Sequence, residues 1–166
     1  MALPGRDIPV VSSLDALDEL VRWRPGMYLR QGVAPGSSAD PRIDDVTGIR
    51  LPGVPVARID PEPWWPGPAI DWIARRVIMN ATSSDQPDRR PWLLYGHFVG
   101  YGPHHEPLVT DIEPVAWIDH DVVDQARQHF TARYPSAGRE HGHGDDLGRP
   151  SAEARVYPPS RRVTAT

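Results

Sequence analysis

Three segments of the chain repeat apolar residues at the spacing of an α-helix. The apolar face of the first segment consists of Leu14, Leu17, Leu20 and Val21. Ser12, followed three residues later by Asp15, is typical of a helix start, and Arg24-Pro25-Gly26 ends the segment. The pattern therefore predicts a helix over residues 13–23.

The second segment, residues 68–81, begins at a proline, which favours the first helical position. Its apolar face consists of Ala69, Ile70, Ile73, Ala74, Val77, Ile78 and Ala81. The opposite, polar face is expected to carry Asp71, Arg75 and Arg76. A third helix is predicted after Asp119 as N-cap, and it ends before Pro135. The apolar stripe of that helix consists of Val122, Val123, Ala126, Phe130 and Tyr134.

Shorter apolar runs predict β-strands between the helices. The expected strands are residues 27–30, 47–51, 54–59, 92–101 and 108–118. The last two are read as an antiparallel hairpin, because Gly102–Pro107 has the length and composition of a turn. Pro114 lacks an N–H group, so it should sit at a bulge or point its nitrogen outward.

The distribution of these elements predicts one α+β domain over residues 12–135, with about three helices on one face of a small antiparallel sheet. Residues 1–11 are expected to be a loose lead-in, and residues 31–45 a surface loop. Residues 82–91 are also expected to form a loop. Residues 136–166 hold few apolar side chains, so we expect a disordered tail.

Composition then excludes several classes of site. The 166 residues include no cysteine, and all 18 basic residues are arginine. Disulfides, thiolate metal sites, Schiff-base lysines and P-loop lysines are therefore excluded. The net charge of −4 comes without a basic stripe, so no nucleic-acid partner is expected. No apolar run suits a signal peptide or a membrane span, so a cytoplasmic location is expected.

The hairpin carries the clearest candidate chemistry. His104, His105 and Glu106 lie in the predicted turn, and His97 and Asp111 lie on the flanking strands. Imidazoles with a carboxylate suit zinc, iron or nickel if they converge, which makes His97, His104, His105 and Asp111 candidate metal ligands. The alternative is an exposed polar turn, because adjacent residues usually point in different directions. No cofactor is expected.

The segment from Pro61 to Pro68 has four prolines in eight residues, which predicts an extended connector carrying Trp64 and Trp65. These rings either cover the core or form a platform for a ligand or peptide. Tyr101 and Glu106 are the other candidate ligand-binding residues.

Two further candidates have ordinary explanations. Asp111 and Glu113 should share one strand face, as a carboxylate pair or as a solvated surface. His141 and His143, with Asp145 and Asp146, could bind divalent ions weakly.

Several short motifs in order resemble a family of short actinobacterial proteins that is known only as a domain of unknown function. The motifs are Leu14-Asp15-Ala16-Leu17, Arg24-Pro25-Gly26-Met27-Tyr28-Leu29-Arg30, Leu51-Pro52-Gly53, Pro61-Glu62-Pro63-Trp64-Trp65, Asp71-Trp72-Ile73-Ala74-Arg75, Val99-Gly100-Tyr101-Gly102-Pro103, Glu106-Pro107-Leu108-Val109 and Pro114-Val115-Ala116-Trp117-Ile118. The resemblance covers residues 12–134, and it implies no activity, substrate or catalytic residue.

Two functional hypotheses follow. The first is a non-enzymatic interaction or accessory protein with a protein partner, since the chain has no recognisable catalytic spacing. The alternative is a small ligand- or metal-binding domain, or an enzyme, that uses the hairpin over residues 92–118.

Overall fold

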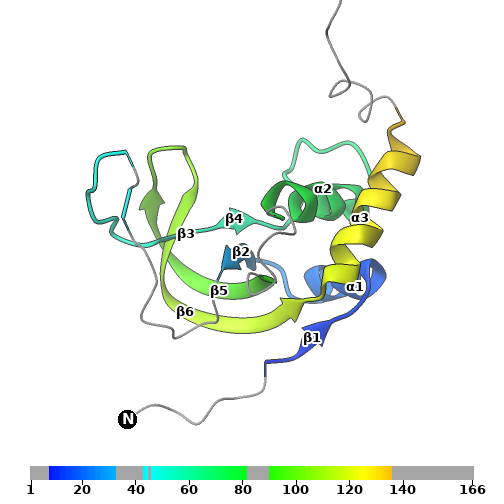
Figure 1. Cartoon of the computed structure of the whole chain (residues 1–166), viewed down its shortest axis with the longest axis horizontal. Helices are drawn as coiled ribbons and strands as arrows, with labels where there is room; N and C mark the ends of the chain where they lie inside the picture. Colours follow the sequence, from blue (N-terminus) through cyan, green and yellow to red (C-terminus); the bar gives the residue numbers. More distant parts are fainter. Residues whose placement is uncertain (1–7, 33–42, 45, 82–89, 136–166) are drawn as a thin grey trace, which may run out of the picture.

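The computed structural model describes residues 8–32, 43–44, 46–81 and 90–135, and these form three helices and six strands (Figure 1). In chain order the elements are β1 (Val10–Val11), α1 (Leu14–Trp23), β2 (Tyr28–Gly32), β3 (Val54–Pro55), β4 (Ala57–Arg58), α2 (Ala69–Asn80), β5 (Arg90–Tyr101), β6 (Pro107–Ile118) and α3 (His120–Arg133). The predicted α+β class is confirmed. None of the helices in the described part of the chain has the length and apolar character that crossing a membrane requires.

The strands form one curled sheet with the order β1-β6-β5-β2-β4. Most pairs are antiparallel, but β1 runs parallel to β6, so the sheet is mixed and not purely antiparallel as predicted. The segment 54–58 pairs at one end with β6, through β3, and at the other end with β2, through β4. This short segment therefore closes the sheet against itself and makes it curl.

Apolar side chains alternate along the central strands and fill two cores, one on each face of the sheet. Leu29 and Leu93 belong to the larger core, which includes buried residues of all three helices. Leu94 and Trp92 belong to the smaller core, to which Val54, Val56 and Val109 also contribute. The sheet is thus covered by helices on one face and by its own curl on the other.

The helix predictions are confirmed, with small shifts at the ends. Ser13, and not Ser12, is the N-cap of α1, and its hydroxyl accepts from the N–H of Ala16 at 3.2 Å. Pro68, the predicted first residue of α2, takes the N-cap position instead, so the helix begins one residue later than predicted. Asp119 caps α3 as expected, through its carboxylate and the N–H of Asp121.

The predicted hairpin is confirmed and slightly longer, because Arg90 and Pro91 join β5 and Pro107 joins β6. A register shift in the β5–β6 pairing falls between Leu93 and Leu94, whose partners are Ala116 and Pro114. Val115 is therefore the extra residue of a bulge, and Pro114 lies beside it as predicted.

Two strand predictions need correction. Residues 47–51 form no strand, and the only pairing found there is a bridge from Arg50 to Ile43. The carboxylate of Asp44 instead accepts from the N–H and the hydroxyl of Thr47, which folds this segment into a turn. The predicted strand 54–59 is divided into β3 and β4 at Val56.

The remaining differences concern the chain between and before the elements. Gln31 and Gly32 extend β2 into the predicted loop 31–45, and Val10 and Val11 form β1 within the predicted lead-in. Residues 33–42, most of the predicted loop 82–91 and the predicted tail 136–166 lie outside the described residues.

Candidate functional site

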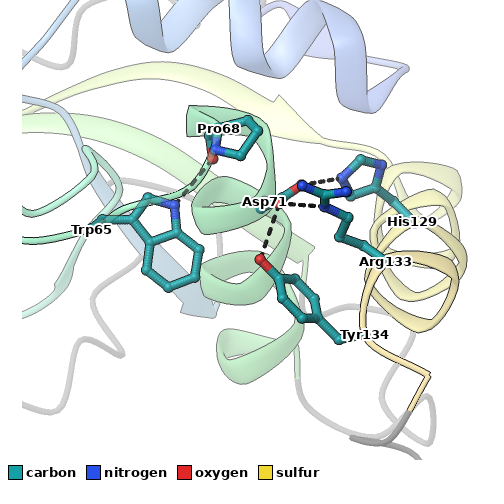
Figure 2. Close-up of polar contacts among 6 residues, drawn as sticks. All are labelled: Trp65, Pro68, Asp71, His129, Arg133 and Tyr134. Carbon is teal, nitrogen blue, oxygen red and sulfur yellow. Dashed lines mark hydrogen bonds and ion pairs between the residues drawn. The ribbon is translucent and has the colours of Figure 1, made fainter.

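One buried carboxylate joins α2 to α3. Asp71 lies in the first turn of α2 and is only 1% exposed. Its Oδ1 lies 2.7 Å from Nε2 of His129, and its Oδ2 accepts from the hydroxyl of Tyr134 at 3.1 Å and from Nε of Arg133 at 3.4 Å (Figure 2). We call these four residues the Asp71 cluster.

The partners of Asp71 keep its charge stable inside the protein. Burial by itself raises the pKa of the Asp71 carboxyl, but the hydrogen bonds from His129 and Tyr134 and the charges of His129 and Arg133 outweigh it, so the pKa lies below its ordinary value. Burial, followed by the hydrogen bond to Asp71, raises the pKa of the Tyr134 hydroxyl. The carboxylate is therefore ionised at neutral pH.

This geometry resembles an acid–base pair, because a buried aspartate orients a partly exposed histidine. However, both carboxylate oxygens are occupied by donors from one end of α3, on residues 129, 133 and 134. The arrangement therefore fits a structural contact that anchors α3 on α2 better than it fits a proton-transfer site.

Three tryptophans pack edge to face beside the start of α2. The ring centroids of Trp64 and Trp65 are 5.6 and 5.3 Å from that of Trp72, and the guanidinium of Arg76 lies over the Trp72 ring at 5.4 Å. Trp72 is 3% exposed and Trp64 is 69% exposed. The indole N–H of Trp65 donates to the carbonyl of Pro68 at 3.1 Å, which fixes the connector to the helix.

The predicted turn residue Glu106 stabilises the hairpin turn itself. Its Oε2 accepts from the N–H of His104 at 2.8 Å, and its carboxylate fills the space that a Cβ at Gly102 would take. The N–H of Gly102 also donates to the Glu106 carbonyl at 2.8 Å. Tyr101, the other predicted ligand-binding residue of the hairpin, is 60% exposed and contacts Phe98.

The structure does not bring the four candidate metal ligands together. His97 is exposed on β5 opposite Thr110, while His104 and His105 are exposed in the turn. Asp111 is exposed on β6 with a positive φ of 51°. Across the described ranges, no three His, Cys, Asp or Glu side chains gather where they could hold a metal ion.

The other polar candidates also lack a common site. Asp111 and Glu113 are both exposed, and a register shift between Tyr95 and His97 interrupts the strand alternation that the face assignment assumed. His141, His143, Asp145 and Asp146 lie outside the described residues.

Apolar side chains are exposed where the hairpin turns. Six of the ten large hydrophobic residues exposed in the described ranges lie there, and we call them the end surface: Ile43, Val46, Ile49, Phe98, Val99 and Tyr101. The turn at residues 43–50 lies beside the hairpin end (Figure 1). Accordingly, the pKa of Asp44 is lowered mainly by its hydrogen bond from Thr47 and also by the charge of His104.

A surface hollow of about 470 Å³ extends from Ile43 of the end surface and Glu106 of the hairpin turn to Met79 and Asn80 of α2. Leu29, Val56 and Met79 contribute apolar lining, and Arg30, Gln31, Asn80 and Glu106 contribute polar groups. Its volume suits a small organic ligand.

The sequence pattern placed Asp71 on the polar face of the helix and gave His129 and Tyr134 no polar role. The correction follows from packing, since α2 is covered by the sheet on one side and by α3 on another, which leaves Asp71 inside. A sequence signal did exist, because His129 and Arg133 are four residues apart and share one helix face.

The comparisons with known proteins concern the family alone. No curated protein and no solved structure matches the chain. A model of a family of unknown function, DUF6098, matches residues 4–143, which includes every helix and strand described above. The predicted resemblance to a family without known function is thereby supported, and the chain belongs to the family of unknown function DUF6098.

Proposed function

We propose that this protein is a non-enzymatic interaction domain that binds a protein partner through the end surface. The observation that carries the proposal is the concentration of exposed large hydrophobic side chains at this one end of the molecule. Exposed apolar side chains that cluster in this way are typical of protein-binding surfaces.

The contrast between the polar and the apolar groups of the molecule supports this proposal. The buried Asp71 has three donors within the protein, whereas Phe98, Val99 and Tyr101 remain exposed to water. Asp111 and Glu113 are exposed carboxylates on the hairpin strand β6. The proposed partner therefore presents apolar side chains to the end surface, and any part of it that reaches β6 presents basic residues to these carboxylates.

The proposal is tested by affinity capture from cells that express the protein natively. The variant Val46→Ser/Ile49→Ser removes two apolar side chains of the end surface, and the control Val10→Ser/Trp23→Ser removes two exposed ones elsewhere. We expect a protein that binds the wild type and the control but not the first variant. The same proteins bound by all three forms would contradict the proposal.

Small-ligand binding is a second candidate function, favoured by the hollow beside Glu106. Native mass spectrometry of the untagged chain from its own host tests it. A bound mass that is lost in Met79→Trp, which would obstruct the hollow, supports a ligand site there. A bare chain mass from the native host would argue against it.

The cellular setting is also a proposal. A cytoplasmic location and an actinobacterial source are inferred from the sequence, the latter from the lysine-free, arginine-rich composition and from the family resemblance. Fractionation of the native host tests the location.

A further inference from the structure

The outer part of β5 has one unpaired edge. β2 pairs with β5 only over residues 90–94, while β6 pairs with it as far as Tyr101. On the side away from β6, residues 96–101 have no strand partner in the described part of the chain. Backbone N–H and C=O groups on such an edge can pair with an added strand.

Apart from its bulge at Val99, this edge lacks the features by which proteins usually prevent strand addition. The residues from Gly96 to Tyr101 include no proline and no Asp, Glu, Lys or Arg, and Phe98, Val99 and Tyr101 are exposed. Because the segment carries no formal charge, two copies laid against each other would meet no like charges within it.

A bulge places two aromatic rings of this edge on one face. The β5–β6 register shifts between Phe98 and Gly100, which makes Val99 the extra residue. As a result Phe98 and Tyr101 lie on the same side despite their odd spacing, and their ring centroids are 5.1 Å apart.

We propose that the added strand is β5 of a second copy of this chain, paired antiparallel about a two-fold axis at Gly100, with the bulged Val99 of each copy left unpaired. In that register Phe98 of each copy faces Tyr101 of the other, so four rings gather on one face of a continuous sheet. The neutral edge and its aromatic pair favour this self-complementary occupant. The inference rests on the proposed function, since it names a partner for part of the end surface.

A charge-swap experiment on the full chain tests the pairing. One variant carries Phe98→Lys/Tyr101→Lys, and the other carries Phe98→Glu/Tyr101→Glu. Sedimentation equilibrium should show a dimer for the wild type and a dissociation constant at least about tenfold higher for either variant alone. A mixture of the two variants should form a one-to-one heterodimer. Trp23→Lys, which adds charge at the end of α1 and away from the edge, should dimerise like the wild type.

Several results would overturn the inference. A wild type that stays monomeric at every concentration would do so, and so would a dimer that persists in both variants. Two monomeric variants that keep the wild-type circular dichroism yet fail to combine would exclude the facing aromatic pairs. In each case, the proposed function would still hold if affinity capture returned a protein that binds the wild type and the control but not Val46→Ser/Ile49→Ser.

Discussion

The two ends of this molecule differ in which side chains they bury and which they leave exposed to water. At the α2–α3 end, the buried carboxylate of Asp71 has three donors within the protein, and Trp72 is packed among other rings. At the hairpin end, the carboxylate of Glu106 also accepts a hydrogen bond from within the turn, but the apolar residues Phe98 and Tyr101 remain exposed. We therefore propose that the first end serves stability and the second serves binding.

This difference shows why the most notable cluster of ionisable groups need not be the functional site. A carboxylate whose oxygens already accept from His129, Arg133 and Tyr134 has little capacity left for a substrate. Exposed apolar surface, in contrast, is unfavourable in water and is relieved by a partner.

The largest expected effect tests the aromatic part of the α2–α3 end. Trp72→Ala removes a buried ring and should reduce the free energy of unfolding by about 3–5 kcal/mol. Trp64→Ala, the matched change on an exposed ring of the same cluster, should cost about 1 kcal/mol. Urea denaturation measures both, and equal losses would show that the exposed ring is as structural as the buried one.

A smaller loss is expected from the Asp71 cluster. Asp71→Ala removes the acceptor of three hydrogen bonds, two of them from basic side chains, and should cost about 2–3 kcal/mol. Asp124→Ala removes an exposed carboxylate that pairs with Arg127 on α3, and should cost less than about 1 kcal/mol. If the two variants melted at the same temperature, the Asp71 cluster would not be what anchors α3 on α2.

The pH dependence of stability sharpens the same point. The folded-state pKa of Asp71 is depressed. The contribution of the Asp71 carboxylate to the free energy of unfolding is therefore fully present above the unfolded pKa of about 3.9, and it is lost as the pH falls through the folded-state pKa. The stability difference between the wild type and Asp71→Asn should therefore be constant near neutral pH and shrink below about pH 4. A difference that grew on acidification would contradict the assigned direction.

The smallest effect on stability is expected at the hairpin end. Val46→Ser/Ile49→Ser changes only exposed side chains, so its free energy of unfolding should stay within about 0.5 kcal/mol of the wild type. Capture of the partner should nevertheless be lost. A variant that unfolded readily would show that these side chains serve the fold, and the contrast between the two ends would fail.

Much of the fold was predictable because local signals agreed with it. The helix over residues 13–23 and the hairpin with Pro114 at its bulge have patterns that packing did not override. The strand predicted at 47–51 failed because Asp44 and Thr47 form a turn and Gly48 adopts a positive φ of 70° there. Turn chemistry thus prevailed over the apolar spacing of Ile49 and Leu51.

The site was less predictable, because it depends on contacts between distant segments. Asp71 and Tyr134 are 63 positions apart, and no spacing rule joins them. Glu106 was identified as a polar group of the turn, but its hydrogen bond to the His104 N–H appears only once the hairpin is folded. Similarly, β1 could not be predicted, because two residues carry no pattern without the β6 strand beside them.

The most direct test of the central claim is site-specific photo-crosslinking in the native host. A photoreactive phenylalanine replaces Tyr101 at the hairpin end in one form and the exposed Trp23 at the end of α1 in the other. We expect a discrete crosslinked protein, either a second copy or another chain, from position 101 and none from position 23. Crosslinks of equal yield from both positions, or from position 23 alone, would contradict the assignment of binding to the hairpin end.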